Sequence, residues 1–297
     1  MSVAKIHIEK ASAWVDFKEI TKMRLAIVVV FSSLAGYFLG VYTINWFHVF
    51  LLAIGGYFMV GASNAYNQIL EKDLDALMDR TKNRPIPAGR MTVKTAFIIA
   101  AIFTILGMAT LYYINPTTAL FGGISIILYV CVYTPLKTRT PLSVFVGAFP
   151  GAIPFMMGWV AATDDFGIEA GTLFMIQFFW QFPHFWAIGW FLYEDYKKGG
   201  FFMLPTGKRD RGTAVQVILY SIWTLLTSLI PVLGVSGRLY ITPLSAVGIG
   251  VLGLGLLYYA FRLYHYKNNI TAKRLMLYSV TYITLIQIIY VADKFLR

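Results

Sequence analysis

Long apolar runs separated by short polar segments fill the chain from about residue 25 onward. Each run is long enough to cross a hydrocarbon layer of about 30 Å as a helix, and lipid-exposed backbone cannot leave its hydrogen bonds unmade. We therefore predict an all-α integral membrane protein with nine transmembrane helices. The predicted spans are 25–43, 48–70, 95–113, 117–134, 143–162, 169–192, 212–235, 243–263 and 275–293.

The basic residues predict the orientation of this bundle. Of the 25 Lys and Arg residues, all except Arg238, Lys294 and Arg297 fall in the segments that share one side with the N-terminus. Because cytoplasmic segments carry the excess of Lys and Arg, the N-terminus is predicted to be cytoplasmic and the C-terminus to lie outside. We expect residues 1–24 to form a cytoplasmic N-terminal segment and residues 25–297 to form one transmembrane domain.

Composition narrows the possible functions. The chain is 58% hydrophobic and only 13% charged, whereas about a quarter of the residues of a soluble domain are charged. The net charge of +11 could suggest nucleic acid. Because the basic residues lie between apolar runs, however, we expect contact with the lipid bilayer and no nucleic acid. The single cysteine, Cys131, excludes a disulfide framework.

One apolar run ends in a stretch rich in charge, NAYNQILEKDLDALMDRTKNRPIPAGR. Most of this stretch belongs to the first charged loop, residues 71–94. Asn67, Glu71 and Asp75 are spaced i, i+4, i+8, so a helix places them within about 80° of one face. This oxygen ladder suits a hard divalent cation such as Mg²⁺, which takes its other ligands from water and a phosphorylated substrate. Arg80 and Arg84 follow, one helical turn apart, and guanidinium groups match phosphate oxygens.

These residues therefore predict a metal and diphosphate site at the membrane surface. The alternative is a solvated loop with ordinary i, i+4 ion pairs. The oxygen ladder begins inside an apolar run, where polar groups are costly and usually functional, and this favours the site.

A second charged loop, residues 193–211, follows the sixth predicted span on the same side. Its Asp195 could add a carboxylate, so that two metal ions hold one diphosphate. Its Lys198, and Lys137 after the fourth span, could neutralise diphosphate charge, or merely anchor the loops and contact anionic lipid. Tyr133 lies at the end of the fourth span, close to Lys137 in the sequence. Lys22, before the first span, could likewise bind diphosphate or merely anchor its segment at the membrane surface.

The sixth predicted span is unusually aromatic, QFFWQFPHFWAIGWFLYEDY. Within it, His184 is either a neutral histidine satisfied by a neighbouring group, or a haem iron ligand or porphyrin contact. Trp180 is a candidate substrate contact in the same segment. In the fifth span, the spacing of Gly147 and Gly151 favours close helix packing over a substrate role.

Three of these segments resemble a known family. NQILEKDLDALMDRTKNRP, YTPLKTRTP and WQFPHFWAIGWFLYEDYKKGGFFMLP are similar to motifs of the UbiA superfamily of intramembrane prenyltransferases, and within it to the branch that farnesylates haem. The resemblance covers nearly the whole chain. It implies a UbiA-type helical bundle, Mg²⁺ as cofactor, farnesyl diphosphate as donor and the 2-vinyl group of haem B as acceptor, with water addition giving haem O. It also implies a bacterial inner-membrane location with the site facing the cytoplasm, and a haem A synthase as downstream partner.

Site residues follow from the matching positions. The resemblance implies catalytic and metal-binding roles for Asn67, Glu71, Asp75 and Asp195. The candidate substrate-binding residues of the whole sequence are Arg80, Arg84, Lys137, Lys198, Tyr133, His184 and Trp180.

The chain departs from the family pattern at two positions. Glu71 stands where aspartate is common, and Phe191 stands where an acid is expected four residues before Asp195. The sequence therefore leaves open whether the site binds one metal ion or two. Two other functions also remain open: prenylation of an aromatic quinone precursor, and a non-enzymatic haem-handling protein or transporter.

Overall fold

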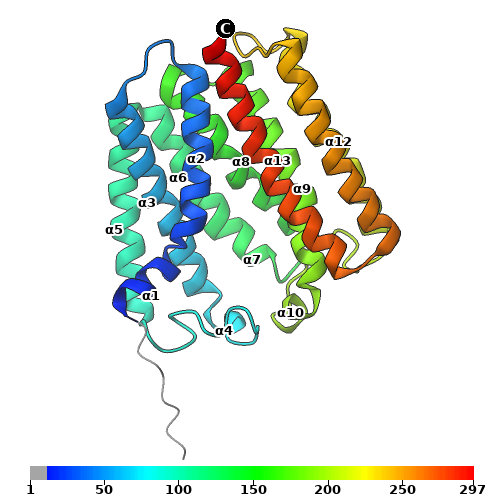
Figure 1. The fold of residues 1–297 in the computed structure, drawn as a ribbon. Coiled ribbons are helices and arrows are strands. Elements are labelled where there is room, and N and C mark those ends of the chain that lie inside the picture. The colour runs from blue at the N-terminus through cyan, green and yellow to red at the C-terminus, as the bar shows by residue number, and fades with distance from the viewer. Residues whose placement is uncertain (1–11) are drawn as a thin grey trace, which may run out of the picture.

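The computed structural model describes residues 12–297, and every regular element in that part of the chain is helical (Figure 1). The long helices are α2 (Met23–Gly40), α3 (Trp46–Leu70), α5 (Val93–Ile114), α6 (Pro116–Ile127) continued by the π-helix η1 (Leu128–Tyr133), α8 (Leu142–Thr163), α9 (Ile168–Phe191), α11 (Arg211–Leu229) continued by the 3₁₀ turn η2 (Ile230–Leu233), α12 (Pro243–Tyr266) and α13 (Asn269–Leu296). The short ones are α1 (Ala13–Ile20), α4 (Lys72–Asp75), α7 (Thr134–Leu136) and α10 (Tyr193–Lys198).

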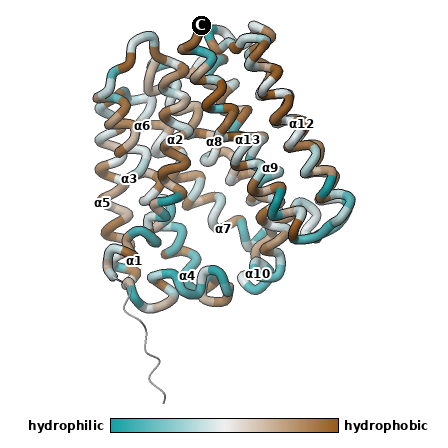
Figure 2. The backbone as a smooth tube through the Cα atoms, viewed as in Figure 1, coloured by the Kyte–Doolittle hydropathy of each residue, from teal (hydrophilic) through white to brown (hydrophobic). Residues whose placement is uncertain are grey.

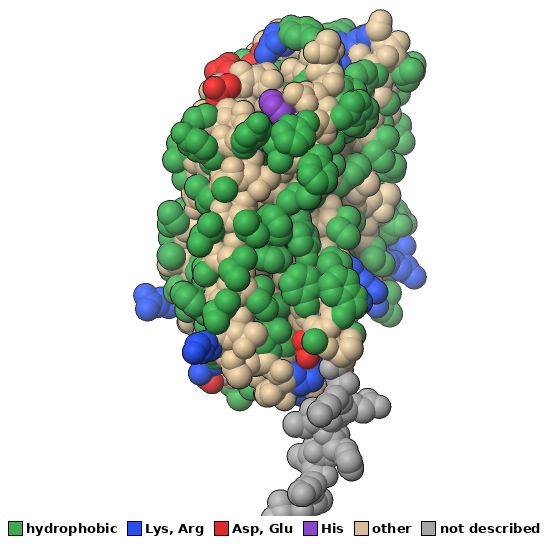
Figure 3. Space-filling model, turned by 90° about the vertical axis from the view of Figure 1, so that its left-hand side faces the viewer, with side chains coloured by type: hydrophobic (Ala, Val, Ile, Leu, Met, Phe, Trp, Pro, Cys, Tyr) green, Lys and Arg blue, Asp and Glu red, His purple; other side chains and the backbone are tan. Residues whose placement is uncertain are grey.

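Each predicted span overlaps a long helix, and the order along the chain is the same. Within residues 12–297, eight helices are long and apolar enough to cross a membrane, and α9 is not among them. α9 has 24 residues, but two glutamines, a proline and a histidine lower its hydropathy. The protein is thus a multi-pass membrane bundle, whereas the ninth span and the orientation stay predictions. Figure 2 shows hydrophilic residues gathered at the end that carries α4 and α10, and the face drawn in Figure 3 is mainly hydrophobic between its two ends.

Helices α2, α8 and α9 pack unusually closely because small residues face their neighbours. A Cβ atom added to Gly158 of α8 would lie 1.8 Å from the carbonyl oxygen of Ser33 in α2. A Cβ atom on Gly151 would lie 1.9 Å from Oε1 of Gln181 in α9. These distances leave room for hydrogen only, and the close packing predicted from the spacing of Gly147 and Gly151 is confirmed.

Gly158→Ala is expected to destabilise the protein by about 1–3 kcal/mol or more, because the new methyl group overlaps rigid backbone. The measurement is the thermal unfolding midpoint in detergent. Gly171→Ala is the matched control, since a Cβ atom at that helical glycine meets nothing within 4 Å. Equal midpoints for the two variants would contradict the packing described here.

The N-terminal part of the chain lies against the first charged loop. Residues 1–11 of the predicted cytoplasmic segment lie outside the described residues, and the next residues form α1. The Gln68 side-chain amide donates hydrogen bonds to the carbonyl oxygens of Glu19 (3.1 Å) and Ile20 (2.9 Å). Arg90 in the first charged loop pairs with Asp16 at 2.8 Å. α1 therefore braces the end of α3, where the oxygen ladder lies.

Candidate metal and diphosphate site

The oxygen ladder stays on one face although its helix is interrupted. α3 ends before Glu71 and α4 begins after it, yet Glu71 N–H donates to the Asn67 carbonyl (2.9 Å) and Asp75 N–H to the Glu71 carbonyl (2.7 Å). The i, i+4 spacing is thus kept. The Asn67 amide donates to Thr134 Oγ1 (3.2 Å), and Lys137 Nζ donates to Glu71 Oε1 (2.8 Å). The ladder therefore faces α7 and the residue that follows it.

A π-helical turn positions the segment opposite the ladder. In η1 the helix widens, and both the backbone N–H and the hydroxyl of Thr134 bond to the Tyr129 carbonyl, the hydroxyl at 2.8 Å. Tyr133 is the last residue of η1, and the centroid of its ring lies 4.6 Å from the Lys137 amine. Gly147 of α8 makes room for this ring, since a Cβ atom there would lie 2.6 Å from it. Such π turns are frequent at functional sites, and the sequence analysis did not anticipate this one.

The ladder carboxylates are buried and paired with cations. Glu71 is 4% exposed and Asp75 0%, while Lys137 is 8% exposed. Arg84 Nη1 lies 2.6 Å from Asp75 Oδ2. Burial raises the pKa of Asp75, although Arg84 opposes the shift. Burial alone would lower the pKa of Lys137, but the carboxylate of Glu71 outweighs it and the pKa lies above its usual value.

One atom of this cluster has no hydrogen-bond partner among residues 12–297. Asp75 Oδ1 is buried without a hydrogen bond, and a buried carboxylate oxygen in that state is costly. A hard divalent cation would satisfy it, with Asn67 and Glu71 supplying further oxygen ligands. In residues 12–297 no three His, Cys, Asp or Glu side chains gather around a possible metal position. The possible ligands are the carboxylates of Glu71 and Asp75 and the amide oxygen of Asn67. Because Mg²⁺ prefers oxygen ligands, this set fits Mg²⁺.

The two arginines of the first charged loop point in different directions. Residues after α4 form successive turns instead of the helix that the spacing of Arg80 and Arg84 suggested. Arg84 turns inward to Asp75. Arg80 is exposed, and its guanidinium lies 5.7 Å from the ring of Tyr196 in α10. Of these two arginines, Arg84 contacts the oxygen ladder directly and Arg80 does not.

The two charged loops meet at the same end of the bundle, where Figure 1 places α4 and α10. The Asp195 carboxylate accepts backbone N–H groups of Asp79 (2.7 Å) and Arg80 (3.3 Å). Lys198 and Lys82 both pair with Asp79, and these two cations lower the pKa of Asp79 to about 2. Phe202 N–H donates to the Lys137 carbonyl at 2.8 Å. Asp195 and Lys198 therefore fasten the second loop over the first, and their direct roles toward metal and substrate stay predictions.

His184 and Trp180 face α13. His184 Nδ1 lies 2.8 Å from Ser279 Oγ, and the Trp180 indole N–H donates to the Ser279 carbonyl at 2.6 Å. Their rings stack with centroids 4.8 Å apart. A histidine satisfied by a neighbouring hydroxyl agrees with the simpler of the two interpretations above. Contact of either residue with haem stays a prediction.

A polar network that the sequence did not predict lies inside the bundle. Gln287 of α13 bonds to Ser32 of α2 (3.1 Å) and to Gln177 of α9 (3.2 Å), and all three residues are buried. The available signal was the presence of amide side chains in otherwise apolar runs, because such groups need partners inside a membrane. This network ties both halves of the bundle together above the site.

Lys22, between α1 and α2, adds a further cation near the ladder. Burial, then the neighbouring charges of Arg84 and Lys137, lower the pKa of its amine to about 7. A folded-state pKa below the ordinary value means that the amine is largely neutral above pH 7 and charged below it. A bound diphosphate would favour the charged form, so its binding would take up a proton above pH 7.

We therefore expect prenyl diphosphate affinity to fall as the pH rises from 7 to about 9, and Lys22→Met to weaken this dependence. Titration of the purified protein with farnesyl diphosphate at several pH values measures it. Arg24→Met, at an exposed position two residues on, is the control. The same pH slope in Lys22→Met and the unmodified chain would contradict the assignment.

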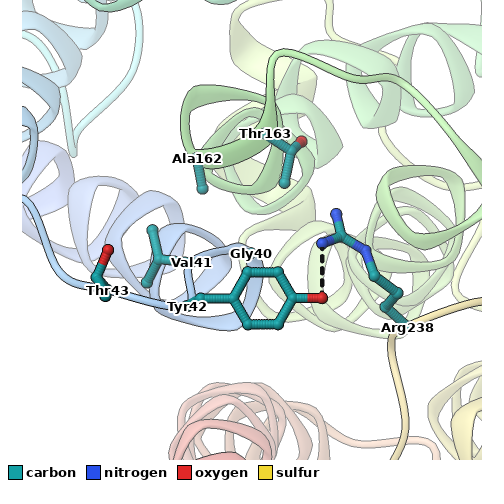
Figure 4. A pocket seen from close by; sticks show the side chains of 7 residues that line it. All are labelled: Gly40, Val41, Tyr42, Thr43, Ala162, Thr163 and Arg238. Atoms are coloured by element: carbon teal, nitrogen blue, oxygen red, sulfur yellow. Dashed lines mark hydrogen bonds between the residues drawn. The ribbon is translucent and has the colours of Figure 1, made fainter.

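The opposite end of the bundle contains a hollow of about 310 Å³ (Figure 4). It is lined by Gly40, Val41, Tyr42, Thr43, Ala162, Thr163 and Arg238. Arg238 donates to the Tyr42 hydroxyl (3.1 Å), and its backbone N–H donates to Glu169 (2.9 Å). Within residues 12–297, Arg238 is the one charged residue among those that line the hollow, and no carboxylate lines it, so the hollow lacks the metal ligands and the second cation that the ladder end offers to a diphosphate.

Comparisons with known proteins show the family to which the chain belongs. The model of the UbiA prenyltransferase family matches residues 29–282. The chain is 71% identical, over 297 residues that cover 100% of it and 99% of the relative, to the protoheme IX farnesyltransferase of Christiangramia forsetii.

Two solved structures share the fold. A structure concerned with digeranylgeranylglyceryl phosphate synthase has a TM-score of 0.77 at 17% identity, covering 94% of this chain and 98% of the other. A UbiA homolog from Archaeoglobus fulgidus bound to GPP and Mg²⁺ has a TM-score of 0.64 at 16% identity, covering 93% and 99%. The family match spans most of the residues that build the bundle and the oxygen ladder. The chain therefore belongs to the UbiA prenyltransferase family.

Proposed function

We propose that this protein transfers the farnesyl group of farnesyl diphosphate to the 2-vinyl group of haem B, with addition of water, giving haem O. The observation that carries the proposal is the buried oxygen ladder, where Asp75 keeps an unpartnered oxygen beside the cations Arg84 and Lys137. This is the charge arrangement that a metal-bound diphosphate needs. The choice of haem as acceptor is supported by the name of the relative that shares 71% of its residues.

Asn67, Glu71 and Asp75 would hold Mg²⁺, which when bound offsets the charge of the diphosphate and makes it a better leaving group. In the described arrangement the two carboxylates hold Lys137 and Arg84. Lys137 and Arg84 would donate charge-assisted hydrogen bonds to the diphosphate oxygens where the carboxylates hold Mg²⁺ in their place. The same cluster would then supply both the metal ligands and the cations that bind the diphosphate.

Farnesyl transfer begins when the bond between C1 and the diphosphate oxygen breaks and the electron pair leaves with the diphosphate. The allylic cation that remains is attacked by the vinyl π electrons of haem, and water then adds to the new cation and loses a proton. Tyr129 and Tyr133, with ring centroids 5.3 Å apart, lie beside the ladder. Their π faces can stabilise the allylic cation, and the apolar bundle keeps bulk water from capturing it early.

The membrane arrangement completes the proposal. We infer nine spans with α9 included, the N-terminus and the site on the cytoplasmic side of a bacterial inner membrane, and a haem A synthase as the protein that takes the product. The lysines and arginines gathered at the ladder end support this orientation. A second Mg²⁺ near Asp195 is compatible with the proposal and is not required by it.

Expression of the chain in a bacterium that makes no haem O tests the proposal in a membrane. We expect a haem species heavier by farnesyl plus water in extracts analysed by chromatography and mass spectrometry. Cells that express Asp75→Asn should lack it at equal protein level in the membrane. A prenylated aromatic acid in place of a modified haem would overturn the choice of acceptor while leaving the family assignment intact.

A further inference from the structure

The hollow at the end of the bundle opposite the oxygen ladder takes no part in the proposed reaction (Figure 4). It lies at a membrane surface, because α2 and α8 are long and apolar enough to cross a membrane and both end beside it, at Gly40 and Thr163. Its volume of about 310 Å³ reaches the lower end of the range for small-molecule sites, about 300–1,000 Å³. The hollow is therefore large enough for a small polar group.

Arg238 supplies the cation of this hollow, and several contacts fix its position. Its backbone N–H donates to Glu169 at 2.9 Å, and Gly237 permits this approach, since a Cβ atom there would lie 2.4 Å from Glu169 Oε1. The guanidinium lies 5.4 Å from the ring centroid of Tyr42 and 5.5 Å from that of Trp159. One of its N–H groups donates to the Tyr42 hydroxyl at 3.1 Å, and within residues 12–297 the others make no hydrogen bond. A guanidinium held in this way can bind one phosphate group.

The carboxyl ends of two helices line the other side of the hollow, where Figure 4 shows Ala162 and Thr163 of α8 and Gly40 of α2. The carbonyl oxygens in the last turn of a helix have no partner within that helix. In the part of the chain that the structure describes, no group donates a hydrogen bond to the carbonyl oxygens of Gly40, Ala162 or Thr163. Because a helix carboxyl end carries partial negative charge, it favours a cation.

The end of α2 already holds one ammonium group from within the protein. The amine of Lys294 donates to the carbonyl oxygens of Phe38 (2.8 Å) and Leu39 (2.9 Å), and also to that of Val41. The carbonyl oxygen of Gly40 belongs to the same turn but takes no part in these bonds. The lysine therefore shows which chemical group suits this helix end, and it leaves the carbonyl oxygens beside the hollow free.

The charges near the hollow disfavour a ligand that is only anionic. Asp164 and Asp165 follow α8 directly and are exposed, and Glu169 Oε1 lies 3.9 Å from Nε of Arg238. These carboxylates repel an anion that has no positive group of its own. The ligand that fits carries one phosphate charge for Arg238 and an ammonium group with N–H donors for the carbonyl oxygens. At a membrane surface, the headgroup of an ethanolamine phospholipid has both.

We propose that the hollow binds the headgroup of a phospholipid that carries a primary ammonium group. The phosphate oxygens accept hydrogen bonds from Arg238, and the ammonium donates to the free carbonyl oxygens at the ends of α2 and α8. The bound lipid joins these two helices to the loop before α12, which carries Arg238. The site is independent of the proposed function, because it lies at the other end of the bundle and its ligand is not a reactant.

Lipid binding by the full chain tests the proposal. The protein is freed of copurified lipid in detergent and titrated with phosphatidylethanolamine, phosphatidylcholine or phosphatidylglycerol of identical short acyl chains. Native mass spectrometry counts the bound lipid. We expect the ethanolamine lipid to bind about ten-fold more tightly than the other two, since neither of them has an N–H donor for the carbonyl oxygens. It should also raise the thermal unfolding midpoint by about 2–4 °C. Equal affinity for the three lipids would overturn the proposal.

Two soluble probes identify the source of the ligand. Phosphoethanolamine has the same charged groups as the headgroup but no acyl chains, and inorganic phosphate lacks the ammonium. We expect both to bind more weakly than the ethanolamine lipid. Phosphoethanolamine that binds as tightly as the lipid would overturn the choice of a lipid, and inorganic phosphate that binds as tightly would overturn the role of the ammonium.

Arg238→Gln removes the guanidinium and keeps the backbone N–H that bonds to Glu169. We expect this variant to bind the ethanolamine lipid about ten-fold more weakly and to lose the rise in unfolding midpoint. Arg297→Gln is the matched control, because Arg297 lies at the same end of the bundle, is also partly exposed and does not line the hollow. Unchanged lipid affinity in a folded Arg238→Gln protein, or the same loss in Arg297→Gln, would overturn the proposal.

Tyr42→Phe keeps the test decisive if Arg238→Gln does not fold. It removes only the hydroxyl that accepts the hydrogen bond from Arg238. We expect the affinity for the ethanolamine lipid to fall by about three-fold, as for the loss of one hydrogen bond that orients the guanidinium. An affinity equal to that of the unmodified chain would contradict the assigned position of the phosphate.

Discussion

Asp75→Asn is expected to reduce kcat/KM for prenyl transfer by about 10³-fold, the upper range for removing one group that stabilises developing charge. Asparagine keeps the volume of the side chain but supplies one neutral oxygen in place of a carboxylate. It also leaves Arg84, now 2.6 Å from Asp75 Oδ2, without a charged partner. Steady-state turnover at several Mg²⁺ concentrations measures the effect.

Asp73→Asn on the same short helix is the matched control. Asp73 is exposed, whereas Asp75 is fully buried, so its loss should leave turnover within about two-fold, as expected for a surface position. Normal activity of Asp75→Asn would remove the oxygen ladder from the reaction. Equal losses in both variants would point to the charge of the loop in general and not to one ligand.

Lys137→Met is expected to raise the Kd for farnesyl diphosphate by about 100-fold. The lysine amine lies 2.8 Å from Glu71 and over the ring of Tyr133, at the position where diphosphate charge would arrive. Its loss also leaves Glu71 buried without a cation, which costs about 3–5 kcal/mol in stability when a buried pair is broken. Binding must therefore be measured below the variant's unfolding midpoint.

This experiment decides between the two roles that the sequence left open for Lys137. If Lys137 only anchors the loop, its replacement by Met lowers the unfolding midpoint and leaves the Kd of the folded protein unchanged. If Lys137 binds diphosphate, its replacement lowers the unfolding midpoint and also raises the Kd. Arg139→Met, at an exposed position two residues away, should change neither quantity.

The helices were predictable because membranes constrain them strongly. Eight of the predicted spans correspond to helices that, within residues 12–297, are long and apolar enough to cross a membrane, because apolar runs of this length satisfy their backbone in lipid as helices. The spacing of Asn67, Glu71 and Asp75 predicted one shared face, and the hydrogen bonds that continue through Glu71 preserve it. Local periodicity was therefore sufficient where the helix is regular.

Other parts of the site depend on contacts that periodicity does not encode. The π turn that ends at Tyr133 arises from one extra residue in a helical turn, and LYVCVY carries no local signal for it. Arg80 and Arg84 diverge because the second charged loop holds the first through Asp195, more than 100 residues away in the chain. Both features result from tertiary packing, so a single sequence predicted the residues of the site better than their pairing.

The most direct measurement is turnover by the purified, detergent-solubilised protein with haem B, farnesyl diphosphate and Mg²⁺, with products separated by chromatography and identified by mass. We expect a haem product that has gained farnesyl and water, and we expect this product to disappear when a chelator removes the metal. A chain that binds farnesyl diphosphate but never modifies haem, or one that modifies haem equally well with chelator present, would contradict the proposed function.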